Sequence, residues 1–140
     1  MRSPAAIAAS LCLGLALGGC SLTSQKPTTP ANTSGPAASI GTLIDNFKSD
    51  GSSANETKIC NDDLSSALQQ ALNAHGGCKT DITNQLASVS TFTLTTTKGV
   101  EVSGNTATAV VQSTYDGKTR NATLHFIKQP KGGWRISGIS

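Results

Sequence analysis

The chain has 140 residues, of which 36% are hydrophobic, 4% are aromatic and 14% are charged, and its formal net charge is +3. This length has room for one domain of ordinary size. Scattered Lys and Arg residues, nearly balanced by acidic ones, argue against a nucleic-acid-binding protein. So few aromatic residues indicate a light core, and we therefore expect a covalent brace within the domain.

The first feature along the chain is an apolar leader that ends in a cysteine. Arg2 precedes an apolar run over residues 5–17 that only Ser10 interrupts. The run is shorter than the roughly 20 residues of a membrane-spanning helix, and its length suits the apolar region of a secretory signal. The motif Leu17-Gly18-Gly19-Cys20, which completes the leader, resembles the lipobox of bacterial lipoproteins.

This resemblance implies that residues 1–19 are a signal peptide and that the Cys20 thiol carries a lipid. Two or three acyl chains, at about 0.8 kcal/mol per buried CH₂, would hold the protein on the extracytoplasmic face of the cell membrane. The alternative is an ordinary signal peptide cut at Ala16-Leu17-Gly18, with Cys20 as a spare thiol.

Residues 20–38 are predicted to be the lipidated cysteine and a flexible tether. Pro27, Pro30 and Pro36 lie among Thr, Ser, Ala and Asn residues, with Lys26 as the only charge and no apolar period. Such a tether would hold a domain clear of lipid headgroups. A single α+β domain is expected over residues 39–140.

The first helix of this domain is indicated by an apolar stripe. Ile40, Leu43, Ile44 and Phe47 follow the i, i+3, i+4, i+7 spacing of one helix face. The segment Asp50-Gly51-Ser52-Ser53 is expected to end the helix.

A second helix is expected to start at Asn61 or Asp62, whose side chains suit its N-terminus, and to end before Gly76-Gly77. A short third helix should follow, with Cys78, Ile82 and Leu86 at i, i+4 and i+8 on its stripe. The 3.6-residue period predicts the buried face of the second helix: Leu64, Ala67, Leu68, Ala71 and Leu72.

Cys60 and Cys78 are predicted to form a disulfide bond. Export places them in an oxidising compartment, and they are the only pair left once Cys12 and Cys20 are assigned to the leader and the lipid. The chain-entropy model gives about 3 kcal/mol for a loop of this size. The alternative, a metal site on Cys60, His75 and Cys78, lacks a fourth ligand, so neither a metal nor another cofactor is expected.

From Ser90 the apolar period changes to 2, and Thr and Val become common, which indicates strands. Asp116-Gly117 and Gly104-Asn105 are hairpin turns, residues 129–133 form a looser turn, and Gly99 is expected to kink or bulge the first strand. These turns predict a curved, four-stranded antiparallel sheet. They place the following apolar residues on one face, which the helices must cover: Phe92, Leu94, Val100, Val102, Ala107, Ala109, Val111, Ala122, Leu124, Phe126, Trp134 and Ile136.

Helices followed by a curved meander that ends in Gly132-Gly133-Trp134-Arg135-Ile136 resemble nuclear-transport-factor-2-like domains. Residues 106–118 and 124–128 carry most of the likeness, which covers about residues 39–140. The whole chain is similar to small actinobacterial lipoproteins and secreted antigens with such a domain. The resemblance implies a cone-like α+β fold, whose cavity holds a ligand or catalytic groups in some members.

No catalytic residue is predicted. Enzymes of this fold place an Asp, His or Tyr in the cavity, whereas the inward positions here are apolar almost throughout. His125 has the opposite parity and is expected to face water or a partner. His75 is interpreted as a structural residue at a helix C-terminus.

The apolar sheet face leaves two interpretations open. Its small residues let a helix pack closely, or they leave a cavity for an apolar ligand. The candidate lining of that cavity is Phe92, Ala107, Ala109, Ala122, Phe126 and Trp134.

Three functions follow from these features. The first hypothesis is a lipid-anchored, non-catalytic binding or docking domain of the cell envelope. Docking of an envelope protein would use an outer patch of Val110, Ile127 and Ile139. The alternatives are a carrier of a small apolar or lipid ligand, and a small isomerase- or dehydratase-like enzyme.

Overall fold

The computed structural model describes residues 34–87, 92–115 and 117–140, and it confirms the α+β class. The leader, Cys20 and most of the tether lie outside these residues. No helix among the described residues is long and apolar enough to cross a membrane. The elements are α1 (Pro36–Ser52), α2 (Glu56–Lys58), the π-helix η1 (Ile59–Asp63), α3 (Ser66–Asn73), α4 (Cys78–Leu86), β1 (Phe92–Thr96), β2 (Glu101–Ser103), β3 (Thr106–Tyr115), β4 (Lys118–Lys128) and β5 (Trp134–Ile139).

Helix α1 carries the stripe predicted from the sequence. Ile40, Leu43 and Ile44 are buried in the core, and Phe47 packs against it from a partly buried position. The helix begins at Pro36, within the segment assigned to the tether, because proline's fixed φ suits the first turn of a helix. Residues 36–38, which were expected in the tether, are therefore part of this helix.

The second predicted helix is interrupted at Leu64. This residue has an extended backbone and forms a parallel bridge with Ile136, and the Ser65 amide donates to the Ile136 carbonyl at 2.8 Å. Pairing with the edge of β5 needs an extended chain, so the helix breaks there. The cap of α3 is accordingly Ser65, whose hydroxyl accepts from the Leu68 amide, and the prediction of Asn61 or Asp62 is wrong.

The predicted buried face of this helix is confirmed only in part. Leu64 is buried, and Leu68 and Leu72 pack against the core from partly buried positions. Ala67 and Ala71 are exposed, because α3 is short and lies at the margin of the molecule.

Two further predictions in the helical part are confirmed. Gly76 and Gly77 both have positive φ, 112° and 105°, and separate α3 from α4. The disulfide Cys60–Cys78 joins η1 to the first residue of α4. Because both thiols are bonded, the alternative metal site with His75 is removed. Within the described ranges, no group of three His, Cys, Asp or Glu residues could hold a metal.

The sheet has the order β1-β3-β4-β5, and β2 also pairs with β3. The predicted first strand is thus two strands, with Gly99 in the interruption. The amides of Thr97 and Lys98 both point to the Val110 carbonyl, at 2.9 and 3.5 Å, as two residues do at a bulge. Five strands therefore replace the predicted four.

The predicted registers are confirmed. Ala107 faces Phe126, Val111 faces Ala122, and Phe126 faces Ile136. The predicted β3–β4 turn includes Asp116, which lies outside the described residues, but the pairing of Tyr115 with Lys118 is the one expected. The apolar residues predicted for this face are buried or half-buried, except for Val102 at 40% exposure on the short strand β2.

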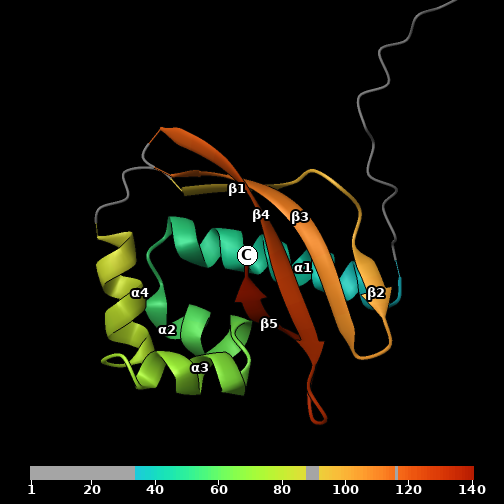
Figure 1. Cartoon of the computed structure of the whole chain (residues 1–140), viewed down its shortest axis with the longest axis horizontal. Coiled ribbons are helices and arrows are strands. Elements are labelled where there is room, and N and C mark those ends of the chain that lie inside the picture. The colour runs from blue at the N-terminus through green and yellow to red at the C-terminus, as the bar shows by residue number, and fades with distance from the viewer. Residues whose placement is uncertain (1–33, 88–91, 116) are drawn as a thin grey trace, which may run out of the picture.

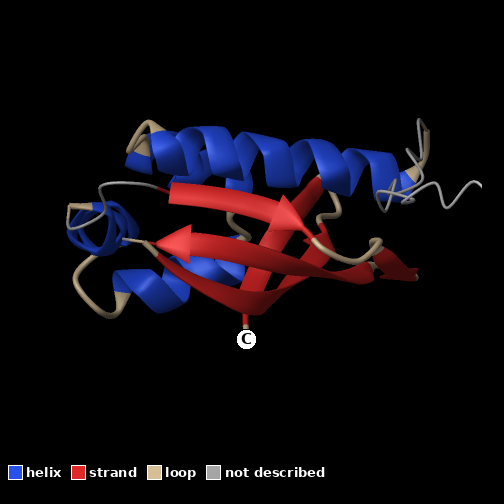
Figure 2. Cartoon of the chain, turned by 90° about the horizontal axis from the view of Figure 1, so that it is seen from above, coloured by secondary structure: helices blue, strands red, loops and turns tan. Residues whose placement is uncertain are grey.

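The helices cover this face in two ways. Helix α1 runs along the sheet, whereas α2, α3 and α4 gather at one end of it (Figures 1 and 2). The core lies between α1 and the middle of the strands, where Ala107 and Ala109 are fully buried beside larger residues. This packing leaves the end of the sheet near α4 less tightly filled.

Candidate ligand-binding cavity

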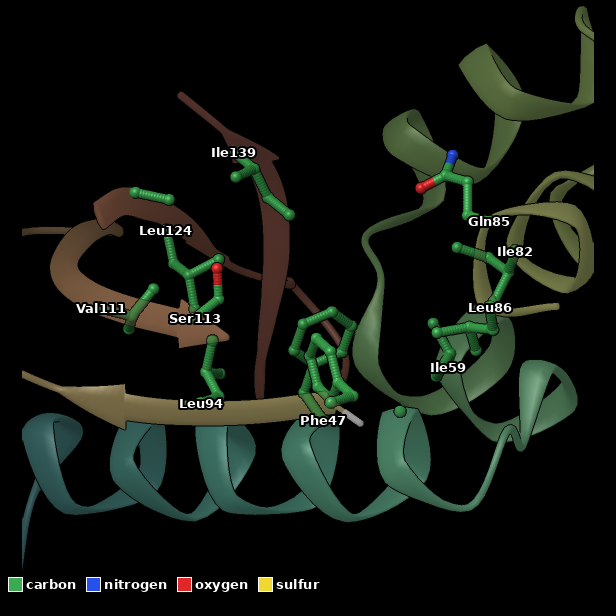
Figure 3. A pocket seen from close by; sticks show the side chains of 13 residues that line it. Phe47, Ile59, Ile82, Gln85, Leu86, Leu94, Val111, Ser113, Leu124 and Ile139 are labelled. Carbon is green, nitrogen blue, oxygen red and sulfur yellow. The ribbon is translucent and has the colours of Figure 1, made fainter. Parts of the chain in front are cut away.

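A cavity of about 170 Å³ lies between the helices and the end of the sheet near α4. Figure 3 shows α1 as its floor, with strand side chains on one side and helix side chains on the other. The helices contribute Phe47, Gly51, Ile59, Ile82, Gln85 and Leu86. The strands contribute Phe92, Leu94, Val111, Ser113, Ala122, Leu124 and Ile139.

Most of this lining is aliphatic or aromatic. Gln85 on α4 and Ser113 on β3 are the polar side chains in the wall, on opposite sides of the cavity (Figure 3). An apolar cavity of about 150 Å³ is large enough to hold a benzene molecule. The cavity therefore suits the body of a single-ring or short-chain apolar molecule.

Phe92 is held at the floor by two contacts from α1. Its ring packs edge to face with Phe47, with ring centroids 6.0 Å apart. Gly51 leaves room for the same ring, since a Cβ atom at this position would lie 2.6 Å from a Phe92 ring carbon. The absence of a side chain at Gly51 thus allows the Phe92 ring to occupy its position in the cavity lining.

Ile139 reaches the cavity because of a bulge in β5. Leu124 pairs with Ile139, and Phe126 pairs with Ile136, so Ser137 and Gly138 stand against the single residue His125. The extra residue reverses the alternation of inward and outward side chains. Ile139, which is 58% exposed, therefore lies at the cavity and not in the predicted outer patch with Val110 and Ile127. The prediction that Ile139 belongs to the outer docking patch is therefore wrong.

Only part of the predicted lining borders the cavity. Phe92 and Ala122 do so, whereas Ala107, Ala109, Phe126 and Trp134 are buried in the core. The alanines near the middle of the sheet serve close packing, which is the first of the two interpretations of that face. Sequence reasoning missed the whole helical wall. The sequence signal for this wall is the apolar spacing of α4, where Ile82 and Leu86 follow Cys78 at i+4 and i+8.

The structure also reveals a buried acid outside this cavity. Asp63 in η1 is 1% exposed, and its Oδ2 atom has no hydrogen-bond partner. Burial, followed by the nearby charges of Asp50 and Asp62, raises its pKa from the ordinary value of 3.8 to about 7, against the opposing effects of Arg135 and Lys58. Asp63 lines a separate polar recess with Asp62, Trp134 and Arg135.

Sequence reasoning did not find this acid. The expected helix start at Asn61 or Asp62 would place Asp63 in the first turn of a helix. Asp63 instead precedes Leu64, whose bridge to β5 draws the chain into the core. A buried carboxyl group with a pKa near 7 is typical of functional sites, and it can also be a purely structural feature.

His125 lies as its parity predicts. It pairs with Thr108 and Gly138, on the face opposite to Phe126, and its Nε2 atom is 2.9 Å from the Ser140 hydroxyl. His75 is exposed beyond the end of α3. Neither histidine lines the cavity.

No protein-family model and no curated protein matches the chain. Among solved structures, it is similar to a protein of Shewanella frigidimarina that is provisionally named as a ketosteroid isomerase. The two share 19% identity over 75% of this chain and 95% of that one, with a TM-score of 0.50. A nuclear transport factor 2 (NTF2-like) superfamily protein of Salmonella enterica matches at 16% identity, over 71% and 89%, with a TM-score of 0.36. The first likeness shows the fold, a cone-like α+β domain.

Proposed function

We propose that this domain binds a small apolar molecule in the cavity between α4, α1 and the sheet. The observation that supports this most directly is the size and lining of the cavity, about 170 Å³ and largely apolar. The outer patch that docking required is not continuous, because the bulge in β5 turns Ile139 inward. The hypothesis of a ligand carrier therefore takes precedence over that of a docking module.

Toluene is a suitable probe for this proposal. We expect saturable binding with a Kd on the order of 0.1–1 mM, because so small a ligand has few atoms with which to gain affinity. The measurement is an NMR titration of the methyl groups of Leu94, Val111 and Leu124, which line the cavity. Unsaturable or absent shifts at these methyl groups would contradict the proposal.

A cavity-filling substitution provides the matched test. Ala122→Leu adds bulk at the cavity wall, so toluene affinity should fall at least about tenfold while the domain stays folded. Thr123→Leu adds bulk one residue further along β4, on the opposite face of the sheet, and should leave toluene binding unchanged. Equal affinities in the two variants would place the toluene site elsewhere.

Lipid anchoring is the second part of the proposal. The motif Leu17-Gly18-Gly19-Cys20 and the leader before it support acylation at Cys20 and export to the outer face of the cell membrane. A carrier held there would meet apolar molecules at the bilayer surface.

Catalysis is the alternative of least support. The prediction that the protein is not an enzyme stays a prediction, and the provisional name of the Shewanella protein concerns that protein alone. Asp63 is the buried group with a pKa suited to acid–base chemistry, yet it lines the polar recess and not the apolar cavity. A ligand in the cavity would therefore not lie against this carboxyl group.

A further inference from the structure

The apolar cavity has a polar and basic margin on its sheet side. Along β3, Ala107, Ala109 and Val111 are buried, and Ser113, two residues further on the same face, is half-buried and lines the cavity. The neighbours of Ser113 point the other way and are already paired, Gln112 with Asn121 and Thr114 with Thr119. Ser113 is thus the half-buried polar side chain on the strand side of the cavity (Figure 3).

Arg120 is the cross-strand neighbour of Ser113. It pairs with Ser113 across β3 and β4, so the two side chains share one face of the sheet with Cβ atoms about 5 Å apart. The cavity lining on β4 ends at Ala122, and the next position on that face is Arg120, which is exposed. Lys118, two residues further, has the same parity and is also exposed. Two exposed cations thus follow the apolar wall along the same face of β4.

We propose that the ligand of this cavity is an amphipathic anion, with a ring-sized or short-chain apolar body and a carboxylate head. This inference rests on the proposed function of the cavity. The body fills the space beside Leu94 and Leu124, and the head reaches the margin at Ser113 and Arg120. A serine hydroxyl donates one hydrogen bond, and a guanidinium group presents a planar fork that matches a carboxylate. The head stays partly hydrated, which avoids the cost of burying a charge.

The test compares two probes of nearly the same shape, toluene and benzoate, at neutral pH. Benzoate should bind about tenfold more tightly than toluene, because charge-assisted hydrogen bonds add to the same apolar contact. Its affinity should fall with added salt, since Arg120 is exposed, whereas toluene affinity should not. Benzylammonium, with the opposite charge, should bind more weakly than either.

Variants separate this inference from the proposed function. Arg120→Gln should remove most of the advantage of benzoate and leave toluene binding unchanged, and Ser113→Ala should act in the same direction with a smaller loss. Lys131→Gln, which removes the same charge in the loop between β4 and β5, should change neither affinity. If toluene binds but benzoate gains nothing, or if Arg120→Gln has no effect, the anionic head is refuted and the cavity proposal stands. If neither probe binds, the proposed function itself fails.

Discussion

At the scale of single residues, the buried carboxyl group of Asp63 is the side chain most at odds with its surroundings. Its Oδ2 atom has no hydrogen-bond partner, and Asp50, itself buried, lies near enough to raise its pKa further. A charged form at this position is costly, so the folded protein favours the protonated form. Folding therefore takes up a proton here, and the stability of the domain should depend on pH.

The sign of that dependence follows from the two pKa values. The pKa of Asp63 is about 7 in the folded protein, whereas the ordinary value for an aspartate is 3.8. At a pH between these two values, the folded state therefore binds more protons than the unfolded state. The free energy of unfolding should then fall by a few kcal/mol as pH rises from about 4 to about 8. Asp63→Asn, neutral at every pH, should flatten the profile and raise stability at pH 8.

Denaturant titrations at pH 4, 6 and 8 provide the measurement. Asp45→Asn is the control, because Asp45 is an exposed carboxylate on α1. It should leave the pH profile of the parent unchanged. A parent protein whose stability rises between pH 4 and pH 8, or an Asp63→Asn profile as steep as that of the parent, would contradict this account.

At the scale of elements, local sequence patterns predicted the features that depend on neighbouring residues, such as turns and strand registers. The sequence motifs Gly104-Asn105 and Asp116-Gly117 predict the observed register of β3 against β2 and β4, and a slip by one residue would have exposed Ala109 and Leu124. Two features depend on pairing between distant parts of the chain and were missed. These are the helix break at Leu64, which pairs with Ile136, and the bulge at Ser137. The bulge brings Ile139 to the strand side of the cavity.

The contact between α1 and β1 makes a prediction about Gly51. Gly51→Ala places a methyl group 2.6 Å from the present position of the Phe92 ring, so this ring, which lines the cavity, must shift. Toluene affinity should fall several-fold, and the gain of up to about 1 kcal/mol that alanine brings to a helix should be offset by the displaced ring.

Gly41 is the matched control in the same helix. A Cβ atom at Gly41 meets nothing within 4 Å, so Gly41→Ala should raise the free energy of unfolding by about 0.5–1 kcal/mol and leave toluene affinity unchanged. Thermal unfolding and the NMR titration, applied to both variants, check the pair. Identical behaviour of the two variants would show that Phe92 does not form the wall of the binding site.

At the scale of the whole molecule, the long helix along the sheet and the helical cluster at its end have different structural roles. Helix α1 and the middle of the strands make the buried core, and the cluster, tied by Cys60–Cys78, closes one end only in part. The disulfide joins η1 to α4, which are adjacent to the cavity through Ile59 and Ile82. A loop of this size is worth about 3 kcal/mol in the chain-entropy model. The disulfide therefore stabilises the helical wall of the cavity in a chain whose hydrophobic core is small.

The proposed membrane localisation of the protein depends on Cys20, which lies outside the described residues. If Cys20 is acylated, the full chain expressed in a lipoprotein-processing bacterium should fractionate with membranes and need detergent for release. Its N-terminal peptide should begin at Cys20 and carry the mass of the acyl chains. Cys20→Ala should move the protein out of the membrane fraction without changing its melting temperature, because the described domain begins with α1 at Pro36. An unmodified Cys20, or a mature chain that begins at another residue, would leave a freely diffusing carrier in place of an anchored one.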